Sequence, residues 1–463
     1  MEANKHQPLP SNLALKTGIS AQLLVPLRSP PGVAEGRPQP CKREGFRISS
    51  AVPTLATMKS RSGIRSVLAG LLVTLAQVFV AVVIIAPEGP LSIRYDTLVQ
   101  HDSYWFANIL ERGYGTTVPP IDRKIMEVSN VAFFPAYPVV AALLRYCLHL
   151  STHVALLLAA QIAAWGFWTY FFLFCDRWKV SRPCQWLAAL AIAAHPAAFF
   201  LIAGYSESLF LMALFGFMYW SSTEGGRAKV LAVIHGYVMS ATRIVGLPCA
   251  LFPVLNATFQ KGSPEEANGR CLIRRIVSPI AIMLGASLGA ISFFLYCFVR
   301  WGRWDLYMLT QNAGWAIVPD YLAVFKPENY HWLVPALRDP TQASQMAMTL
   351  GALLLVAIVL CELLPVIRRS STWTTRLGFY FCGAIIYYLS VSGVACVQME
   401  SMLRYEFCLH ALMVLAIVHL LQQVRLSFAA RVSAVAVLGV LSASGVALQF
   451  WYVWNFTRGG WVA

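Results

Sequence analysis

Two carboxylates beside apolar segments are the first candidates for chemistry in this sequence. Asp102 lies in the string HDSYWFANILERGY at 101–114, and Glu207 lies in the string YSES at 205–208. A positioned carboxylate can accept the proton of a reacting hydroxyl group, so each residue is a candidate base or ligand-binding group. The structural alternatives are that Asp102 caps a short helix and that Glu207 lies near the positive end of a helix capped by Ser206.

Two arginines could supply the complementary charge. Arg243 lies inside a long apolar stretch, and Arg404 precedes another. A guanidinium group in such a place needs an anion or a carboxylate, and its planar fork suits phosphate. Binding of a phosphate and pairing of Arg243 with Glu207 are therefore both open. Four further carboxylates share the polar loop of Asp102 and compete with it as candidates: Asp96, Glu111, Asp122 and Glu127.

A proline-rich aromatic string, VAFFPAYP at 131–138, contains Phe134 and Tyr137. Its two prolines predict an irregular approach to the next apolar segment. Either the string simply starts a helix with an aromatic belt, or its rings contact a ligand.

Composition indicates the elements that must position these residues. Of 463 residues, 58% are apolar and only 12% are charged, whereas soluble domains carry about 25% charged residues. A bilayer accepts an apolar exterior that water does not. The net charge of +15 comes from short basic clusters between apolar segments, which is typical of membrane proteins and excludes nucleic acid as the expected partner.

We predict an all-α, polytopic transmembrane helical bundle with roughly 10–12 spans. The first span covers 66–86, which is uncharged and longer than the core of a signal peptide. The other apolar segments are 131–150, 153–174, 185–204, 206–221, 229–257, 276–300, 346–367, 376–396, 406–424 and 432–454.

Basic residues should mark the cytoplasmic ends of these spans. Two spans between 131 and 174 would put Arg177, Lys179 and Arg182 outside, against this rule. We therefore expect either a half-length segment there or a break of 229–257 near Arg243 into two short helices, as membranes tolerate where backbone lines a cavity.

Residues 1–64 differ from the membrane domain at 65–463. They are rich in Pro, Ser and Gly and carry nine Lys/Arg against three Glu, so we predict a disordered leader, with Met58 as an alternative start. Two exoplasmic loops follow, at about 87–130 and 301–345. In the first, the spacing of apolar residues predicts a short amphipathic helix from Asp102 to Gly113 at the membrane surface.

The 11 cysteines form no CxxC pair, and most lie inside apolar runs. Small thiols buried between helices explain them best. We therefore predict no metal site, no disulfide framework and no cofactor.

These strings in this order resemble the PIG-V family, the GPI mannosyltransferase 2 group and its prokaryotic relatives. The resemblance rests on Asp102 with the following 109–114, on FFPAYP at 133–138, on YSES at 205–208 and on the Arg-x-x-Gly that begins at Arg243. It covers about 66–250, with Arg404-Tyr405 beyond. His101 stands where the family has Trp, and His195 stands where it has Asn.

The resemblance implies a GT-C architecture and an inverting mannosyltransferase. Its donor would be polyprenyl- or dolichyl-phosphate mannose, and its acceptor a glycolipid or glycan on the exoplasmic or lumenal face. By similarity, Asp102 is the base, and Arg243 and Arg404 stabilise the departing phosphate. The remaining substrate-binding residues implied are Glu207, Tyr205, Phe134 and Tyr137.

The source of the chain decides the expected membrane: the bacterial inner membrane, which we favour, or the endoplasmic reticulum membrane. The alternative function is a polytopic transporter or lipid flippase, which intramembrane charges and broken helices would suit. A non-catalytic membrane scaffold is a third hypothesis.

Overall fold

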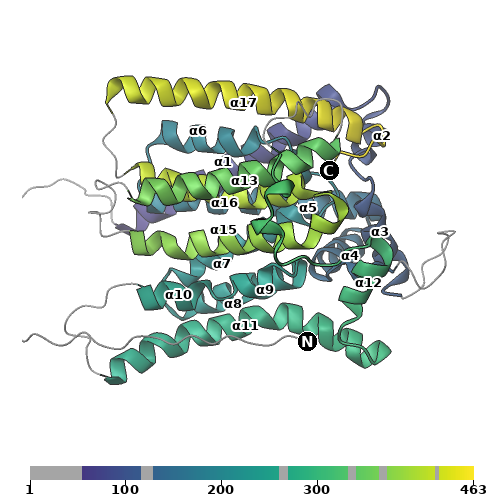
Figure 1. Ribbon diagram of the computed structural model, residues 1–463, viewed down its shortest axis with the longest axis horizontal. Helices are drawn as coiled ribbons and strands as arrows, with labels where there is room; N and C mark the ends of the chain where they lie inside the picture. Colours follow the sequence, from purple (N-terminus) through teal and green to yellow (C-terminus); the bar gives the residue numbers. More distant parts are fainter. Residues whose placement is uncertain are drawn as a thin grey trace, which may run out of the picture. The chain divides into compact units, whose positions relative to one another are not determined.

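The computed structural model describes residues 55–115, 129–259, 269–331, 340–363, 373–422 and 427–462. Within these ranges every regular element is helical, which confirms the all-α prediction (Figure 1). The α-helices are α1 (Leu55–Phe79), α2 (Leu91–Asp96), α3 (Asp102–Arg112), α4 (Ala136–Leu148), α5 (Thr152–Arg177), α6 (Arg182–Ala193), α7 (Glu207–Ser221), α8 (Gly226–Thr242), α9 (Gly246–Cys249), α10 (Phe252–Phe259), α11 (Gly269–Trp301), α12 (Leu306–Trp315), α13 (Pro340–Leu363), α15 (Trp373–Val394), α16 (Met402–Leu421) and α17 (Phe428–Phe456).

Shorter elements connect them. A π-helix, η1 (Val80–Ile85), continues α1, and 3-10 turns occupy η2 (Asn130–Ala132), η3 (Ala198–Leu201), η5 (Ala323–Phe325), η6 (Pro327–Asn329) and η7 (Ala395–Val397). Helix α1 begins at Leu55, so 55–64, which we assigned to the leader, are helical. The rest of the predicted leader lies outside the described residues.

Seven helices in the described ranges are long and apolar enough to cross a bilayer. They are Gly63–Ile85, Thr152–Arg177, Ile276–Trp301, Ser344–Leu363, Arg376–Val397, Met402–Leu421 and Val432–Phe456. The chain is therefore a multi-pass integral membrane protein, as composition predicted. The expected count of 10–12 spans is higher because several apolar segments form short helices.

The segment at 131–150 is the clearest of these differences. It holds η2 and then α4, which has only 13 residues. At 1.5 Å per residue such a helix is about 20 Å long, too short for a hydrocarbon core of about 30 Å. Likewise, α6 has 12 residues and α7 has 15, and 229–257 breaks after Thr242. Both explanations offered for the misplaced basic residues, a half-length segment and a broken helix, are thus found together.

The short α4 removes the conflict with the charge rule. The Ser66 hydroxyl, near the start of the first span, donates to Asp176 Oδ2 at 3.3 Å. The C-terminal end of α5 therefore lies beside the N-terminal end of α1. Arg177, Lys179 and Arg182 follow at that end, together with Arg65, where the rule expects basic residues.

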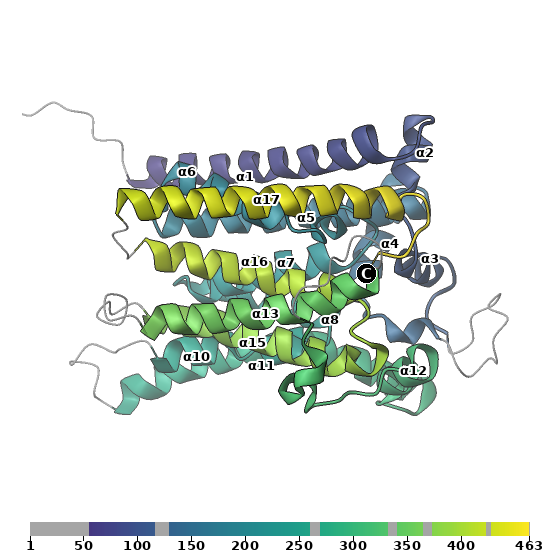
Figure 2. The same ribbon diagram turned by 45° about the horizontal axis from the view of Figure 1, so that its top comes forward.

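The opposite end carries the polar loops. Figure 2 shows α2, α3, α4 and α12 at one end of the long helices, opposite the end at which α16 finishes and α17 begins. Helix α3 matches the predicted amphipathic helix, and Gly113 ends it with φ +75°. Of the first loop, 116–128 lie outside the described residues, and so do the candidates Asp122 and Glu127.

Close helix packing holds the broken segments in place. A Cβ atom at Gly289 of α11 would collide with the carbonyl oxygen of Tyr237 on α8. The Ser240 hydroxyl donates to the Ala286 carbonyl at 2.5 Å. Small residues let membrane helices approach this closely, so α8 ends at a fixed place against α11, directly before Arg243.

Candidate functional site

A cavity of about 260 Å³ lies where the broken helices meet the loops of one end. Its wall includes the start of α3, the loop before α4, the break after α8, part of α12 and the first turn of α16. Its charged members are Asp102, Glu207, Arg243 and Arg404. Aromatic and apolar side chains form most of the rest, among them Phe106, Phe133, Phe134, Tyr205, Phe210, Tyr307, Tyr321, Leu389 and Tyr405.

The four charged side chains form a chain of alternating sign. Arg404 Nη1 lies 2.6 Å from Asp102 Oδ2, and Arg404 Nε lies 3.2 Å from Glu207 Oε1. The same Glu207 oxygen accepts a hydrogen bond from Arg243 Nη1 at 3.0 Å. Two carboxylates thus balance two guanidinium groups. Pairing of Arg243 with Glu207, one of the two alternatives drawn from the sequence, is present.

Asp102 is placed by the loop before α3 and by a close approach of two segments. It is the first residue of α3, and His101 before it has φ +50° and makes no side-chain cap. The Gly204 N–H donates to the Leu98 carbonyl at 3.1 Å, and a Cβ at Gly204 would lie 2.9 Å from Ser103 Oγ. Glycine at 204 therefore allows the segment before α7 to lie against α3. His101 occupies the N-cap position and the Asp102 carboxylate pairs with Arg404, so Asp102 is not the cap of α3.

Glu207 opens α7 in the most buried part of the site. Only 1% of its side chain is exposed, against 17% for Asp102. Ser206 is the N-cap residue but makes no side-chain capping hydrogen bond. A carboxylate in the first helical turn is favoured by the helix dipole, and two arginines add to that stabilisation.

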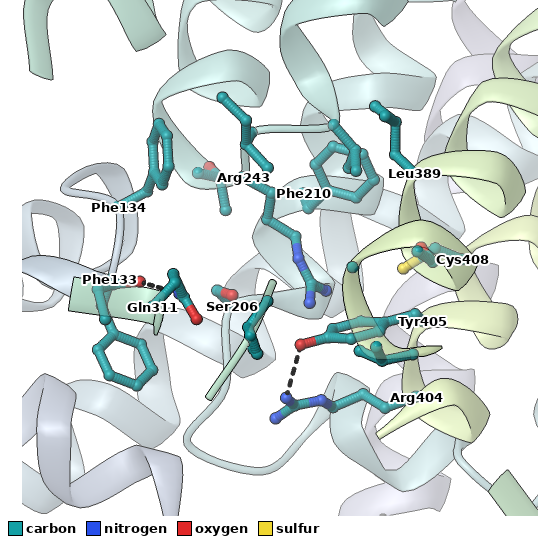
Figure 3. A pocket seen from close by; sticks show the side chains of 18 of the residues that line it. Phe133, Phe134, Ser206, Phe210, Arg243, Gln311, Leu389, Arg404, Tyr405 and Cys408 are labelled. Atoms are coloured by element: carbon teal, nitrogen blue, oxygen red, sulfur yellow. Dashed lines mark hydrogen bonds between the residues drawn. The ribbon is translucent and has the colours of Figure 1, made fainter. Parts of the chain in front are cut away.

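Arg243 lies at the predicted break. Helix α8 ends at Thr242, and Arg243 adopts an extended backbone with φ −151° and ψ +145°. At Gly246 a Cβ would lie 2.6 Å from the Met239 carbonyl oxygen, so only glycine allows the chain to turn this tightly against α8. The turn directs the Arg243 side chain into the cavity (Figure 3).

Arg404 and Tyr405 come from the first turn of α16. The preceding segment contains Gln398, Met399 and Ser401, all with φ between +56° and +66°. Such left-handed residues cost energy and cluster at functional sites. Figure 3 shows the Tyr405 ring between the two guanidinium groups, with its centroid 4.8 Å from the Arg243 guanidinium and 5.2 Å from that of Arg404.

Tyr205 also contacts Arg404, whose guanidinium lies 5.1 Å from the ring centroid. Burial, and then the nearby Asp102 carboxylate, raise the pKa of Tyr205 well above its usual value. Its hydroxyl therefore keeps its proton at neutral pH and can donate a hydrogen bond.

Two of the other predicted residues lie apart from this charged group. Phe134 lines the cavity and packs edge-on against Tyr307, with ring centroids 4.9 Å apart. Tyr137 is fully buried behind it, and its hydroxyl donates to the Leu156 carbonyl at 2.8 Å. Tyr137 does not line the cavity, so the substrate-binding role implied for it has no support in the geometry; its helix turns it toward α5 instead.

The competing carboxylates of the first loop also lie away from the cavity. Glu111 accepts a hydrogen bond from the Thr152 hydroxyl at 2.9 Å, and Asp96 lies 3.8 Å from His153. Neither lines the cavity. Among the described carboxylates of that loop, Asp102 is the one that reaches it.

Sequence reasoning missed the contribution of the second polar loop. Tyr307 and Gln311 of α12 line the cavity, and Gln311 Nε2 donates to the Ala132 carbonyl at 3.0 Å. The spacing of Tyr307 and Gln311, one helical turn apart, was the available signal.

A second polar group lies outside the cavity, between α6 and α16. His195, Glu406 and His410 offer one metal-ligating atom each, all within 4.8 Å of one another. His195 Nδ1 accepts the Ala197 N–H at 3.1 Å, which places the ring proton on Nε2, facing Glu406 Oε2 at 2.7 Å. The atom that would face a metal thus carries a proton. Hydrogen bonding accounts for this cluster, which the sequence did not predict.

Comparisons with known proteins give no family for this chain. No family model matches the sequence, and no curated protein matches it. One similar solved structure is ArnT from Cupriavidus metallidurans bound to undecaprenyl phosphate, at 16% identity and TM-score 0.49, covering 82% of this chain and 63% of ArnT. Another is the archaeal oligosaccharyltransferase AglB from Archaeoglobus fulgidus in complex with an inhibitory peptide and a dolichol-phosphate, at 12% identity and TM-score 0.45, covering 86% and 56%.

The chain thus spans less than two thirds of the length of either protein. At these TM-scores the likeness transfers no function, and the PIG-V resemblance stays a prediction.

Proposed function

We propose that the protein is an inverting membrane glycosyltransferase. It takes a mannosyl residue from a polyprenyl- or dolichyl-phosphate carrier and transfers it to a glycolipid or glycan acceptor. The observation that carries this proposal is the group of two arginines and two carboxylates inside one cavity with apolar and aromatic walls. Arginine suits a phosphate, a carboxylate suits a hydroxyl proton, and aromatic walls suit a sugar ring.

Each group has a defined part in the reaction. Asp102 accepts the proton of the acceptor hydroxyl, whose oxygen forms the new bond to the anomeric carbon. The bond from that carbon to the phosphate oxygen breaks, and its electron pair leaves with the polyprenyl phosphate. Arg243 and Arg404 stabilise the developing negative charge. Attack from the face opposite the phosphate inverts the anomeric centre.

The position of the cavity supports an exoplasmic or lumenal reaction. Its lining residues come from the end that carries α3 and α12, whose place Figure 2 shows. Arg65, Arg177 and Arg182 lie at the other end, near the hydrogen bond between Ser66 and Asp176. The basic end is the expected cytoplasmic side. We assign the protein to the bacterial inner membrane, or to the endoplasmic reticulum membrane if the source is eukaryotic.

The test is transfer of radiolabelled mannose from polyprenyl-phosphate-mannose to a total lipid extract by the purified protein in proteoliposomes. Asp102→Asn should lower transfer by at least about 100-fold, the usual contribution of a general base. Glu111→Gln, on the same helix but outside the cavity, is the matched control and should stay active. Equal activity of the two variants would remove Asp102 from the mechanism, and no transfer by the unaltered protein would refute the proposal.

A transporter or lipid flippase is the second candidate, because two interrupted helical segments meet at a charged cavity. The chain breaks between α6 and α7 and again between α8 and α10, and both breaks contribute to its wall. Transporters use such broken helices at their binding sites. Movement of the labelled carrier lipid across the bilayer of the proteoliposomes, with the sugar still attached, would favour this candidate.

A further inference from the structure

The charge balance of the cavity limits how an anion can bind there. Each arginine already has a carboxylate partner, and the four side chains sum to zero. A phosphate that enters adds negative charge to a buried group with no surplus positive charge. Burying an unpaired charge is costly. An anion therefore binds well only if one of the two carboxylates breaks its ion pair with an arginine.

The two carboxylates are not equivalent in this respect. Glu207 is 1% exposed and lies within 3.2 Å of both guanidinium groups, so releasing it would leave a buried charge without a partner. Asp102 is 17% exposed and has one arginine contact among the described residues. It is the first residue of a short helix and lines the cavity. Separating Asp102 from its arginine therefore costs less free energy than separating Glu207 from its two arginines.

Arg404 has other contacts that hold it in place during such an exchange. Its Nη2 donates to the Tyr405 hydroxyl at 3.4 Å, its Nε lies 3.2 Å from Glu207, and its guanidinium contacts the ring of Tyr205. Only Nη1, which donates to Asp102, needs to change partner. The guanidinium can therefore stay where it is while one acceptor replaces another.

From these contacts we infer that the carrier phosphate takes the place of the Asp102 carboxylate on Arg404. The inference rests on the proposed function and defines the order in which the donor binds and the base becomes available. While Asp102 is paired with Arg404, its Oδ2 accepts the Nη1–H group at 2.6 Å, so this oxygen is not free to contact an acceptor hydroxyl. Binding of the phosphate frees the carboxylate beside the sugar, so the donor binds first and the base becomes available only when the leaving group is in place.

Calorimetric binding of a polyprenyl phosphate in detergent micelles tests the exchange. Asp102→Asn keeps the shape of the side chain but removes the competing charge, so it should bind the lipid phosphate at least about fivefold more tightly. Glu111→Gln removes a carboxylate from the same helix without touching an arginine and should bind like the unaltered protein. An Asp102→Asn variant that binds no more tightly than Glu111→Gln would overturn the inference.

A double-mutant cycle separates exchange on Arg404 from a general change in charge. In an Arg404→Gln background, Asp102→Asn should bring no gain, since the contested guanidinium is gone; an equal gain in both backgrounds would refute the exchange. Arg404→Gln removes the arginine partner of Asp102 and leaves Glu207 with Arg243 alone. If this variant fails to fold, the comparison of Asp102→Asn with Glu111→Gln decides alone. Absence of phosphate binding in every variant would defeat the donor assignment too, whereas binding without any gain defeats only the exchange.

Discussion

Glu207 is the shared carboxylate partner of buried Arg404 and partly buried Arg243. The free energy of unfolding should therefore depend on Glu207 more than on Arg243. Removing one member of a buried ion pair costs about 3–5 kcal/mol when its partner keeps an unpaired charge. Glu207→Gln deprives Arg243 of its carboxylate and leaves Arg404 with Asp102 alone. We expect a loss of about 3–5 kcal/mol for this variant.

Arg243→Gln should cost less, because Glu207 keeps its contact with Arg404. Losing one charge-assisted hydrogen bond corresponds to about 1.5–3 kcal/mol. In the double variant Glu207→Gln with Arg243→Gln, two neutral amides face each other. Its loss of unfolding free energy should therefore be smaller, by about 1–3 kcal/mol, than the sum of the losses in the two single variants.

Unfolding of the purified protein in mixed micelles by increasing SDS, followed by circular dichroism, measures these losses. Glu111→Gln is the control, since its exposed carboxylate has no arginine partner among the described residues. It should change the unfolding free energy by less than about 0.5 kcal/mol. If the loss in the double variant equals the sum of the two single losses to within about 0.5 kcal/mol, Glu207 and Arg243 do not interact. That result would refute the ion pair between them.

Three further predictions follow from the packing, the site and the topology. Gly289→Ala should destabilise the protein by about 1–3 kcal/mol, because its Cβ would enter the backbone of α8. Gly439→Ala, inside α17 and with nothing within 4 Å, should lose no stability in the same SDS titration, since alanine favours a helix over glycine. In the mannose transfer assay, Tyr405→Phe should keep most of the activity and Tyr405→Leu should lose it, because the ring between the arginines matters more than a hydroxyl hydrogen bond of 3.4 Å; equal losses would contradict this. A membrane-impermeant maleimide should reach Cys396 and Cys184, both exposed, from opposite faces of sealed vesicles; labelling from one face would refute the topology.

The sequence by itself determined the local features of this protein. The spacing of apolar residues by three and four positions predicted the helix from Asp102 to Gly113, because residues so spaced lie on one face of a helix. The break at Arg243 was also predicted as one of two alternatives, since a charge, Gly246 and a proline interrupt an apolar stretch there. Composition established the membrane class, because apolar surface of that extent needs a bilayer.

Only the tertiary structure decided which residues meet. Asp102 and Arg404 are 302 positions apart, and no local pattern encodes a contact over that distance. Tertiary structure also decided the place of α4, whose apolar sequence resembles a span but whose length and packing against α5 keep it at one end. It likewise decided that Tyr137 turns away from the cavity. An apolar sequence predicts that a segment avoids water. Lipid and protein interior are equally apolar, so only the packing of the helices decides whether that segment crosses the bilayer or lines a cavity.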